Sequence, residues 1–214
     1  MKPNLADLRK SYDKGSLEIN AVIDHPLNLF ETWFKEAEQS DFIEEANAMT
    51  LSTLGKSGFP KSRVVLLKGF SEEGFVFFTN YESEKGRSML SNPKVGITFF
   101  WPSLERQIII KGNAEKISSA RSDDYFNSRP RGSQLGALAS PQSSVIPNRQ
   151  FLQDRLAALM DEYRNKSIPR PDHWGGIVVK PVQIEFWQGR PNRLHDRISC
   201  QLINKVWKSE RLAP

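Results

Sequence analysis

Cysteine is almost absent from this chain of 214 residues, and so are several features that mark common classes of protein. Cys200 is the single cysteine, which excludes an internal disulfide and a cysteine-rich zinc site. No apolar run approaches the roughly 18 residues that a membrane-spanning helix needs. Residues 1–15 contain no apolar segment typical of a secretory signal. We therefore expect a cytoplasmic protein that does not bind membranes.

Sequence motifs of common nucleotide-binding, metal-binding and hydrolytic enzymes are also missing. No two glycines have G-x-G spacing, so the dinucleotide fingerprint is absent, as is the Walker A loop. His25, His173 and His195 are far apart in sequence and no H-E-x-x-H motif occurs, so a zinc site would need an unusual assembly. The chain also lacks the G-x-S-x-G motif of hydrolases. We therefore expect no metal ion.

The composition is that of a globular protein with an excess of basic residues. Hydrophobic residues make up 38% of the chain and charged ones 26%, with a formal net charge of +5. This charge favours an anionic partner, either nucleic acid or several small phosphate groups. Lysines and arginines are mixed with carboxylates and form no basic tail, which weakens the nucleic-acid alternative. Residues 1–20 are polar and form a separate N-terminal segment, and the length predicts a single domain, over 21–214.

Hydrophobic periodicity predicts both helices and strands. Helices are expected over 26–40, 83–91, 119–127 and 148–165, with a short helical piece in 129–144. Strands are expected over 48–55, 62–70, 74–80, 94–101, 106–118, 175–189 and 203–214. The apolar faces of the first and last helices comprise Leu27, Phe30, Trp33, Phe34 and Ala37, and Phe151, Leu152, Leu156, Leu159 and Tyr163.

The order of these elements predicts the fold class. Residues 71–74 form a tight turn, so the strands on either side should make a hairpin. Successive antiparallel strands with helices between them are typical of a mainly β protein with helices, in the α+β class. We therefore expect a closed or partly closed antiparallel β-barrel.

Two basic residues bracket the apolar run "RVVLLK". Arg63 and Lys68 are an odd number of residues apart, so a regular strand would direct them to opposite faces. One interpretation is an ordinary strand with charged ends. The other is that one or both side chains reach an anion at the rim of the barrel.

A hydroxyl, a guanidinium and a phenol recur in "YFNSRPRGSQLG". Tyr125, Arg129 and Ser133 are four residues apart, so a near-helical path would bring them together. Pro130 disfavours one unbroken helix, but a helix that ends before a second helical turn keeps the three residues close. They are a suitable donor set for a phosphate. The alternative is a solvated helix end with Arg129 paired to Asp123 or Asp124.

The segment "GRPNRLHDRIS" over 189–199 concentrates charged groups after an apolar strand. It contains Arg190, Arg193, His195, Asp196 and Arg197. From composition alone it is a solvated turn, an anion site, a metal or acid–base site, or the edge of a cofactor pocket. Gln107 at a strand end and Trp187 in an apolar strand also have two interpretations. Each is either an ordinary structural residue or a residue that contacts a planar ligand.

Ten segments together resemble one family. They are "RVVLLK", "FFTN", "NPKVGITFFW", "LERQI", "YFNSRPRGSQLGA", "PQSS", "WGGIVV", "IEFWQG", "NRLHDR" and "ERLAP", in the order of the pyridoxine/pyridoxamine 5′-phosphate oxidases. The resemblance extends from about Leu8 to Pro214, and "RLHDR" after "IEFWQG" is highly specific. It implies a split β-barrel homodimer with FMN at the subunit interface.

The resemblance also implies an activity. Pyridoxine 5′-phosphate and pyridoxamine 5′-phosphate would be oxidised to pyridoxal 5′-phosphate in vitamin B6 metabolism. A hydride would pass from C4′ of the substrate to the flavin, and O2 would reoxidise the flavin with release of H2O2.

Residues that match the family's motifs are assigned by position. The resemblance implies FMN contacts from Arg63, Val64, Val65, Leu66, Leu67, Lys68, Phe78, Thr79, Lys85, Gln107, Gln142, Ser143, Trp187 and Arg197. It implies that Lys68, Tyr125, Arg129 and Ser133 bind the substrate phosphate, and that Arg193 and His195 lie beside the substrate ring as the catalytic pair. Arg9 and Tyr12 match an N-terminal segment that closes over the substrate.

Two positions depart from the family pattern. Glu84 stands where many relatives have a basic residue, so Arg87 is a candidate to replace the lost phosphate contact. Phe78 stands where a tyrosine is frequent, which removes a hydroxyl.

Two rival functions follow from the same sequence. The alternative within this fold is a non-catalytic protein that binds FMN or carries pyridoxal phosphate, and the presence of both Arg193 and His195 favours the oxidase. A nucleic-acid-binding β-barrel would have exposed aromatic residues interleaved with lysine and arginine. The aromatic residues here stand mostly in apolar strands.

Overall fold

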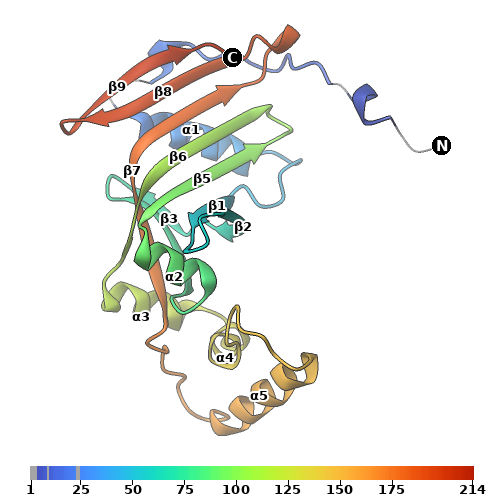
Figure 1. The fold of residues 1–214 in the computed structure, drawn as a ribbon, viewed down its shortest axis with the longest axis vertical. Helices are drawn as coiled ribbons and strands as arrows, with labels where there is room; N and C mark the ends of the chain where they lie inside the picture. The colour runs from blue at the N-terminus through green and yellow to red at the C-terminus, as the bar shows by residue number, and fades with distance from the viewer. Residues whose placement is uncertain (1–3, 9, 23–24) are drawn as a thin grey trace. The chain divides into compact units, whose positions relative to one another are not determined.

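The computed structural model describes residues 4–8, 10–22 and 25–214, and its strands belong to a nine-stranded sheet (Figure 1). The strands are β1 (Ala48–Leu54), β2 (Pro60–Leu66), β3 (Gly69–Ser71), β4 (Gly74–Asn80), β5 (Lys94–Trp101), β6 (Arg106–Lys116), β7 (Trp174–Gln188), β8 (Asp196–Ile203) and β9 (Val206–Leu212). They pair in the order β2-β1-β5-β6-β7-β4-β3, with β8 between β7 and β9. Pairs β3–β4, β4–β7, β7–β8 and β8–β9 are antiparallel, which confirms the predicted arrangement.

Helices occupy the connections between strands. The α-helices are α1 (Pro26–Glu38), α2 (Glu84–Ser91), α3 (Ser119–Ser128), α4 (Arg131–Ala139) and α5 (Arg149–Glu162), and the 3-10 helices are η1 (Leu5–Asp7), η2 (Ile19–Ala21) and η3 (Pro191–Arg193). This mixture confirms the α+β class. No helix in the described ranges is long and apolar enough to cross a membrane.

Internal contacts divide the chain into two compact units. Unit 1 comprises the described residues up to Thr50, together with 96–111 and 181–214. Unit 2 comprises 51–95 and 112–180. Each unit is therefore assembled from segments that are distant in sequence. The single domain expected over 21–214 stays a prediction.

Helix α1 supplies much of the core of unit 1. His25 caps the helix, because its Nδ1 accepts a hydrogen bond from the N–H of Leu27 at 3.2 Å. The predicted apolar face is buried, and Phe30 and Trp33 lie edge-on to Phe99 and Phe186 at 5.4 and 5.5 Å between ring centroids. Burial of each such side chain stabilises the fold by about 1.5–3 kcal/mol.

The core of unit 2 lies among α3, α4 and the start of β7. Phe126, Leu135, Ile168 and Trp174 form its buried cluster. The predicted inner face of α5 is half-buried, while the opposite face of the helix is exposed. This confirms which face points inward but not that the helix contributes buried residues.

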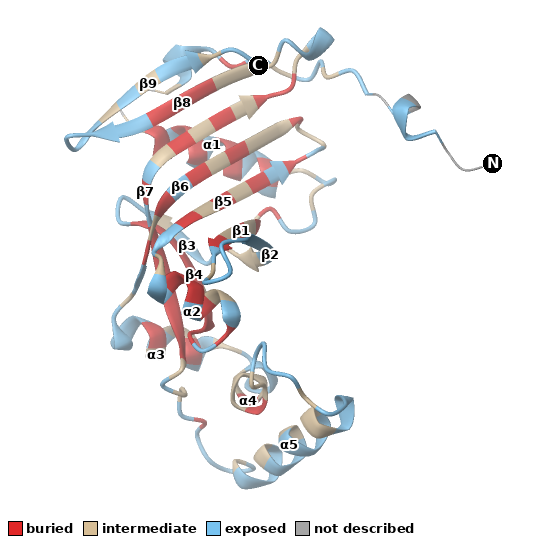
Figure 2. Ribbon diagram, in the orientation of Figure 1, coloured by how far each residue is buried: buried red, intermediate tan, exposed pale blue. Residues whose placement is uncertain are grey.

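Alternating burial determines which strand residues can form a site. Buried and more accessible residues alternate along β5 and β6, as Figure 2 shows by colour.

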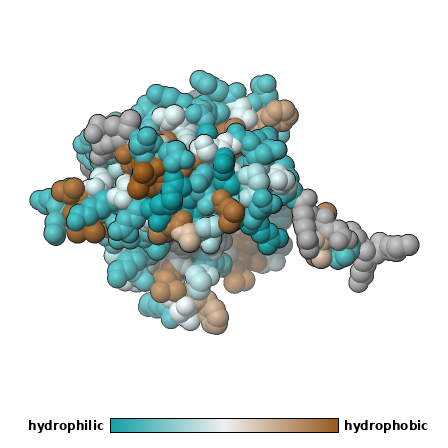
Figure 3. All heavy atoms as spheres, turned by 90° about the horizontal axis from the view of Figure 1, so that it is seen from above, coloured by the Kyte–Doolittle hydropathy of each residue, from teal (hydrophilic) through white to brown (hydrophobic). Residues whose placement is uncertain are grey.

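In Figure 3 hydrophilic side chains predominate on the face in view, and the hydrophobic ones form separate small patches.

Two strand predictions need correction. The strand expected over 62–70 is interrupted, because β2 ends at Leu66 and β3 begins at Gly69. The hairpin with β4 is confirmed by the pairing of Ser71 with Gly74. The closing strand expected over 203–214 is preceded by another strand, β8, which begins at Asp196 inside the segment interpreted as a turn. The local charges in "HDR" obscured this strand, whose formation depends on pairing with β7 and β9.

Candidate functional site

Unit 2 contains a cavity of about 860 Å³ between β2, β4, α3 and α4. Its lining includes many of the predicted residues: Arg63, Val64, Val65, Leu66, Lys68, Phe78, Thr79, Lys85, Tyr125, Arg129, Ser133 and Gln142. Its volume falls within the range of small-molecule sites, roughly 300–1,000 Å³. The positions predicted for a cofactor and those predicted for a substrate phosphate thus share one cavity.

The interruption between β2 and β3 brings Arg63 and Lys68 to the same cavity. A regular strand would have directed them to opposite faces, but β2 ends at Leu66, so the two side chains line one cavity. The backbone N–H of Lys68 donates to the carbonyl of Val76 at 2.8 Å, beyond the end of β2. Leu67, between them, is only 4% exposed and joins the core instead of the cavity lining.

Two cations at one end of this cavity are fixed by neutral partners. Arg63 donates to Oγ1 of Thr53 at 2.7 Å, and Nζ of Lys85 donates to Oε1 of Gln142 at 3.1 Å. Burial lowers the pKa of Arg63. Burial also lowers the pKa of Lys85, and the neighbouring charge of Arg63 lowers it further. An anion bound here would stabilise both positive charges and so raise both pKa values.

Tyr125, Arg129 and Ser133 come together as the spacing predicts. Helix α3 ends at Ser128 and Pro130 begins the turn into α4, so two helices replace one unbroken helix. All three side chains line the cavity.

Arg129 is not paired as the solvated-helix alternative requires. Asp123 instead accepts from Nε of Arg170 at 2.6 Å. The guanidinium of Arg129 lies 4.5 Å from the ring centroid of Trp174, and its NH1 atom is buried without a hydrogen-bond partner in the described structure. Burial lowers the pKa of Arg129. A buried donor without a partner is costly, so this atom suits a ligand that accepts a hydrogen bond.

Aromatic rings form one wall of the cavity. Phe78 stacks on Tyr125 with ring centroids 3.7 Å apart, and on Trp174 at 5.5 Å. Thr79, next to Phe78, has a buried Oγ1 atom without a hydrogen-bond partner in the described structure. Sequence reasoning assigned no role to Trp174, although its position before two glycines in "WGGIVV" was a usable signal.

Unit 1 contains a second cavity, of about 880 Å³. It is lined by Leu8, Lys10, Ser11, Tyr12, Arg190, Asn192, Arg193 and His195. Three residues predicted to contact the substrate, Tyr12, Arg193 and His195, are therefore together, while Arg9 lies outside the described residues. Asn192 and Arg193 have φ angles of 57° and 62°, a strained backbone that is concentrated in functional sites.

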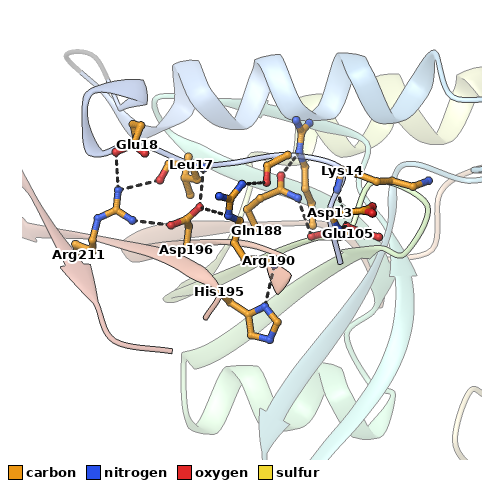
Figure 4. Close-up of polar contacts among 12 residues, drawn as sticks. Asp13, Lys14, Leu17, Glu18, Glu105, Gln188, Arg190, His195, Asp196 and Arg211 are labelled. Atoms are coloured by element: carbon orange, nitrogen blue, oxygen red, sulfur yellow. Dashed lines mark hydrogen bonds and ion pairs between the residues drawn. The ribbon is translucent and has the colours of Figure 1, made fainter. Parts of the chain in front are cut away.

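The orientation of His195 follows from its neighbours. Its Nδ1 atom accepts a hydrogen bond from the backbone N–H of Arg190 at 3.0 Å (Figure 4). Its ring lies 4.6 Å from that of Trp187, centroid to centroid, and 5.8 Å from that of Tyr12. Because Nδ1 is an acceptor, the proton of the neutral imidazole is on Nε2, which is then a donor.

Four other predicted residues lie outside the linings given for these two cavities. Gln107 is half-buried in β6, and Ser143 is exposed with a φ of 72°. Trp187 reaches the second cavity only through its contacts with Tyr12 and His195. Arg197 donates to Oε1 of Glu185 and to the carbonyl of Ala213, each at 2.8 Å. Their assignments stay predictions.

The proposed compensation for Glu84 finds no support in the geometry. Glu84 pairs with Lys61, and Arg87 donates to the carbonyl of Glu82. Arg87 lines a separate cavity of about 220 Å³. The cavity of about 860 Å³ is instead lined by four cations, Arg63, Lys68, Lys85 and Arg129.

Comparison with known proteins assigns the chain to a family. Residues 36–160 match the model of the family described as pyridoxamine 5′-phosphate oxidase. The chain belongs to this oxidase family. Residues 174–214 also match the C-terminal dimerisation region of pyridoxine 5′-phosphate oxidases.

Individual relatives agree with this assignment over the full length. The chain is 56% identical over 214 residues to the pyridoxine/pyridoxamine 5′-phosphate oxidase of Christiangramia forsetii, covering 100% of both chains. It is 54% identical to that of Synechocystis sp., covering 99% of this chain and 98% of the relative.

A solved structure supports the fold. The crystal structure of PhzG from Burkholderia lata 383, in complex with tetrahydrophenazine-1-carboxylic acid, has a TM-score of 0.88 at 26% identity. The similarity covers 96% of this chain and 100% of that chain. The split β-barrel that the family resemblance predicts for this chain is confirmed.

Proposed function

We propose that this protein is an FMN-dependent oxidase that converts pyridoxine 5′-phosphate and pyridoxamine 5′-phosphate to pyridoxal 5′-phosphate. The observation that carries the proposal is the donor cluster of the unit 2 cavity, where Lys68, Tyr125, Arg129 and Ser133 converge. A guanidinium, an ammonium and two hydroxyls match the charge and acceptor atoms of a phosphate dianion. The names of the relatives support phosphorylated vitamin B6 compounds as the substrates.

The remaining residues of the cavity suit FMN. Arg63 and Lys85 supply positive charge, and Gln142 and the unpaired Oγ1 of Thr79 supply polar contacts. The segment Val64–Leu66 supplies apolar surface for a ring. When bound, FMN supplies the acceptor for the hydride from C4′ of the substrate and transfers the electrons to O2, which gives H2O2.

Arg193 and His195 are the proposed catalytic pair. The guanidinium of Arg193 would hold the substituent on C4′, and His195 would donate a hydrogen bond from Nε2, because its Nδ1 is already occupied by Arg190. The alcohol substrate yields the aldehyde directly. The amine yields an imine, which water hydrolyses to the aldehyde and ammonia.

A homodimer in the cytoplasm completes the proposal. The match to a dimerisation region over 174–214 supports two copies, and the family resemblance supports FMN at their interface. Phosphate groups bound in the unit 2 cavity would account for the excess of basic residues, so the proposal needs no nucleic-acid partner.

The decisive experiment starts from purified protein. We expect yellow protein, or protein that becomes yellow with FMN, and equimolar pyridoxal 5′-phosphate and H2O2 from pyridoxamine 5′-phosphate under air. Protein that stays colourless after incubation with FMN would overturn the proposal. Yellow protein without turnover of either substrate would favour the non-catalytic carrier instead.

A further inference from the structure

Glu105 is a buried carboxylate with no part in the function proposed above. It stands in the turn between β5 and β6, with a φ of 56° and 1% of its surface exposed. Burying a carboxylate is expensive unless hydrogen bonds satisfy it. Its partners therefore indicate what the turn is built to hold.

Those partners lie in the N-terminal segment. Oε2 of Glu105 accepts hydrogen bonds from the backbone N–H groups of Asp13 and Lys14, at 2.9 and 3.0 Å (Figure 4). Oε1 lies 3.6 Å from Nζ of Lys10, whose side chain is mostly exposed. Nζ of Lys14 also donates to the carbonyl of Ser103 in the same turn, at 2.7 Å.

The turn also touches the strand end that leads to the second cavity. The N–H of Gly189 donates to the carbonyl of Glu105 at 2.7 Å. A Cβ atom at Gly189 would lie 2.8 Å from Cβ of Tyr12 and 3.0 Å from Cβ of Glu105. Only glycine therefore lets Tyr12 lie so closely against this backbone.

Tyr12 directly precedes the two anchored N–H groups. Its ring lies edge-on to Trp187 at 5.8 Å and next to His195 at the same centroid distance. Fixing the backbone at 13 and 14 thus fixes one wall of the cavity that holds Arg193 and His195.

The geometry points to Glu105 as a positioning residue, which anchors the N-terminal segment and so holds Tyr12 against the catalytic pair. This inference rests on the proposed function for its link to substrate, whereas the anchor itself is a set of contacts within the chain, chiefly those of Glu105 with two backbone amides. Further along the segment, Asp196 accepts from the N–H of Leu17 at 3.0 Å, and Arg190 donates to the carbonyl of Gly15 at 2.7 Å. Glu105 is the anchor nearest to Tyr12.

Hydrogen exchange of the full-length holoprotein tests the anchor without relying on turnover. In Glu105→Ala we expect the amides of Asp13 and Lys14 to exchange at least about 10-fold faster, since each loses a bond to a charged acceptor. Glu105→Gln keeps an acceptor oxygen and should retain most of the protection. Glu115→Ala, which removes an exposed partner of Lys180, is the matched control and should behave as wild type.

Steady-state kinetics tests the positioning. We expect Glu105→Ala to raise KM for pyridoxamine 5′-phosphate about 10-fold with a smaller change in kcat, and to leave FMN affinity unchanged. The effect should be non-additive with Tyr12→Ala, because both changes remove the same contact.

Three results would overturn the inference: unchanged exchange at 13 and 14, equally faster exchange across β5 and β6, or strict additivity with Tyr12→Ala. If wild-type protein oxidises neither substrate, the proposed function fails, and the exchange result alone decides the anchor.

Discussion

Arg129 combines a half-buried positive charge with a buried donor atom, NH1, that has no hydrogen-bond partner among the described residues. A protein selected only for stability would exchange such a group for an apolar one of similar size. Its guanidinium, held against Trp174, instead suits the recognition of a phosphate, whose oxygens can accept two of its N–H bonds at once. Replacing Arg129 should therefore stabilise the ligand-free protein but weaken the binding of its ligand.

We predict that Arg129→Met weakens binding of pyridoxamine 5′-phosphate about 10- to 100-fold, which corresponds to a charged hydrogen bond of roughly 1.5–3 kcal/mol. Unfolding of the ligand-free protein should need as much denaturant as in wild type, or more. Titration calorimetry and urea unfolding measure the two effects. Arg164→Met removes an exposed arginine of the same unit and is the control. Equal weakening for pyridoxamine, which lacks the phosphate, would contradict the assignment.

Lys85 gives the cavity a pH-dependent charge. Burial and the charge of Arg63 lower its pKa, so the ammonium loses its proton below the ordinary lysine value. Only the protonated form attracts a phosphate dianion. FMN affinity should therefore be highest below the lowered pKa and fall as pH rises through it.

Lys85→Arg should remove this fall, because arginine stays protonated over the whole range. Fluorescence titration of FMN between neutral and alkaline pH measures the two profiles. The same alkaline loss in both proteins would show that another group titrates.

Two local backbone features depart from regular strand geometry. The interruption at Leu67 and Lys68 turns a strand with alternating side chains into a bend that directs both cations to one cavity. The turn between β8 and β9 places Asn204 and Lys205 at φ angles of 51° and 65°. Two consecutive positive φ angles are typical of a type I′ hairpin turn, for which Asn-Gly is preferred.

We predict that Lys205→Gly stabilises the protein by about 0.5–1 kcal/mol, because glycine adopts the left-handed conformation without steric cost. Lys208→Gly, in the extended strand β9, should destabilise it by a similar amount. Urea unfolding midpoints compare the two variants. A loss of stability in Lys205→Gly would contradict the assigned turn.

Across the whole molecule, the net charge of +5 and the cations that line the unit 2 cavity favour ligands that carry phosphate. FMN meets this requirement, while riboflavin has the same ring system without the phosphate. Comparing the two separates the contribution of the anion from that of ring stacking.

We expect FMN at about 100 times its Kd to stabilise the protein by about 2.7 kcal/mol, a rise in Tm of roughly 5–10 °C. Riboflavin at the same concentration should give a clearly smaller shift. Differential scanning fluorimetry measures both, and light scattering should give twice the mass of one chain. Equal shifts for the two flavins would contradict phosphate anchoring.

The sequence alone determined most of the elements and the family. Local periodicity predicted α1, its buried face and the interruption at Pro130, because each depends on residues within a few turns. The order of short motifs over nearly the whole chain carried the resemblance that the comparisons then confirmed.

Only the tertiary structure decided which side chains share a cavity and what supports them. Strand spacing placed Arg63 and Lys68 apart, and the bend after Leu66 put them together. The anchoring of Asp13 and Lys14 by Glu105 joins groups 92 and 91 residues apart in sequence. Periodicity records only whether a residue prefers water or the core, so the partner of a buried polar group emerges only once the chain has folded.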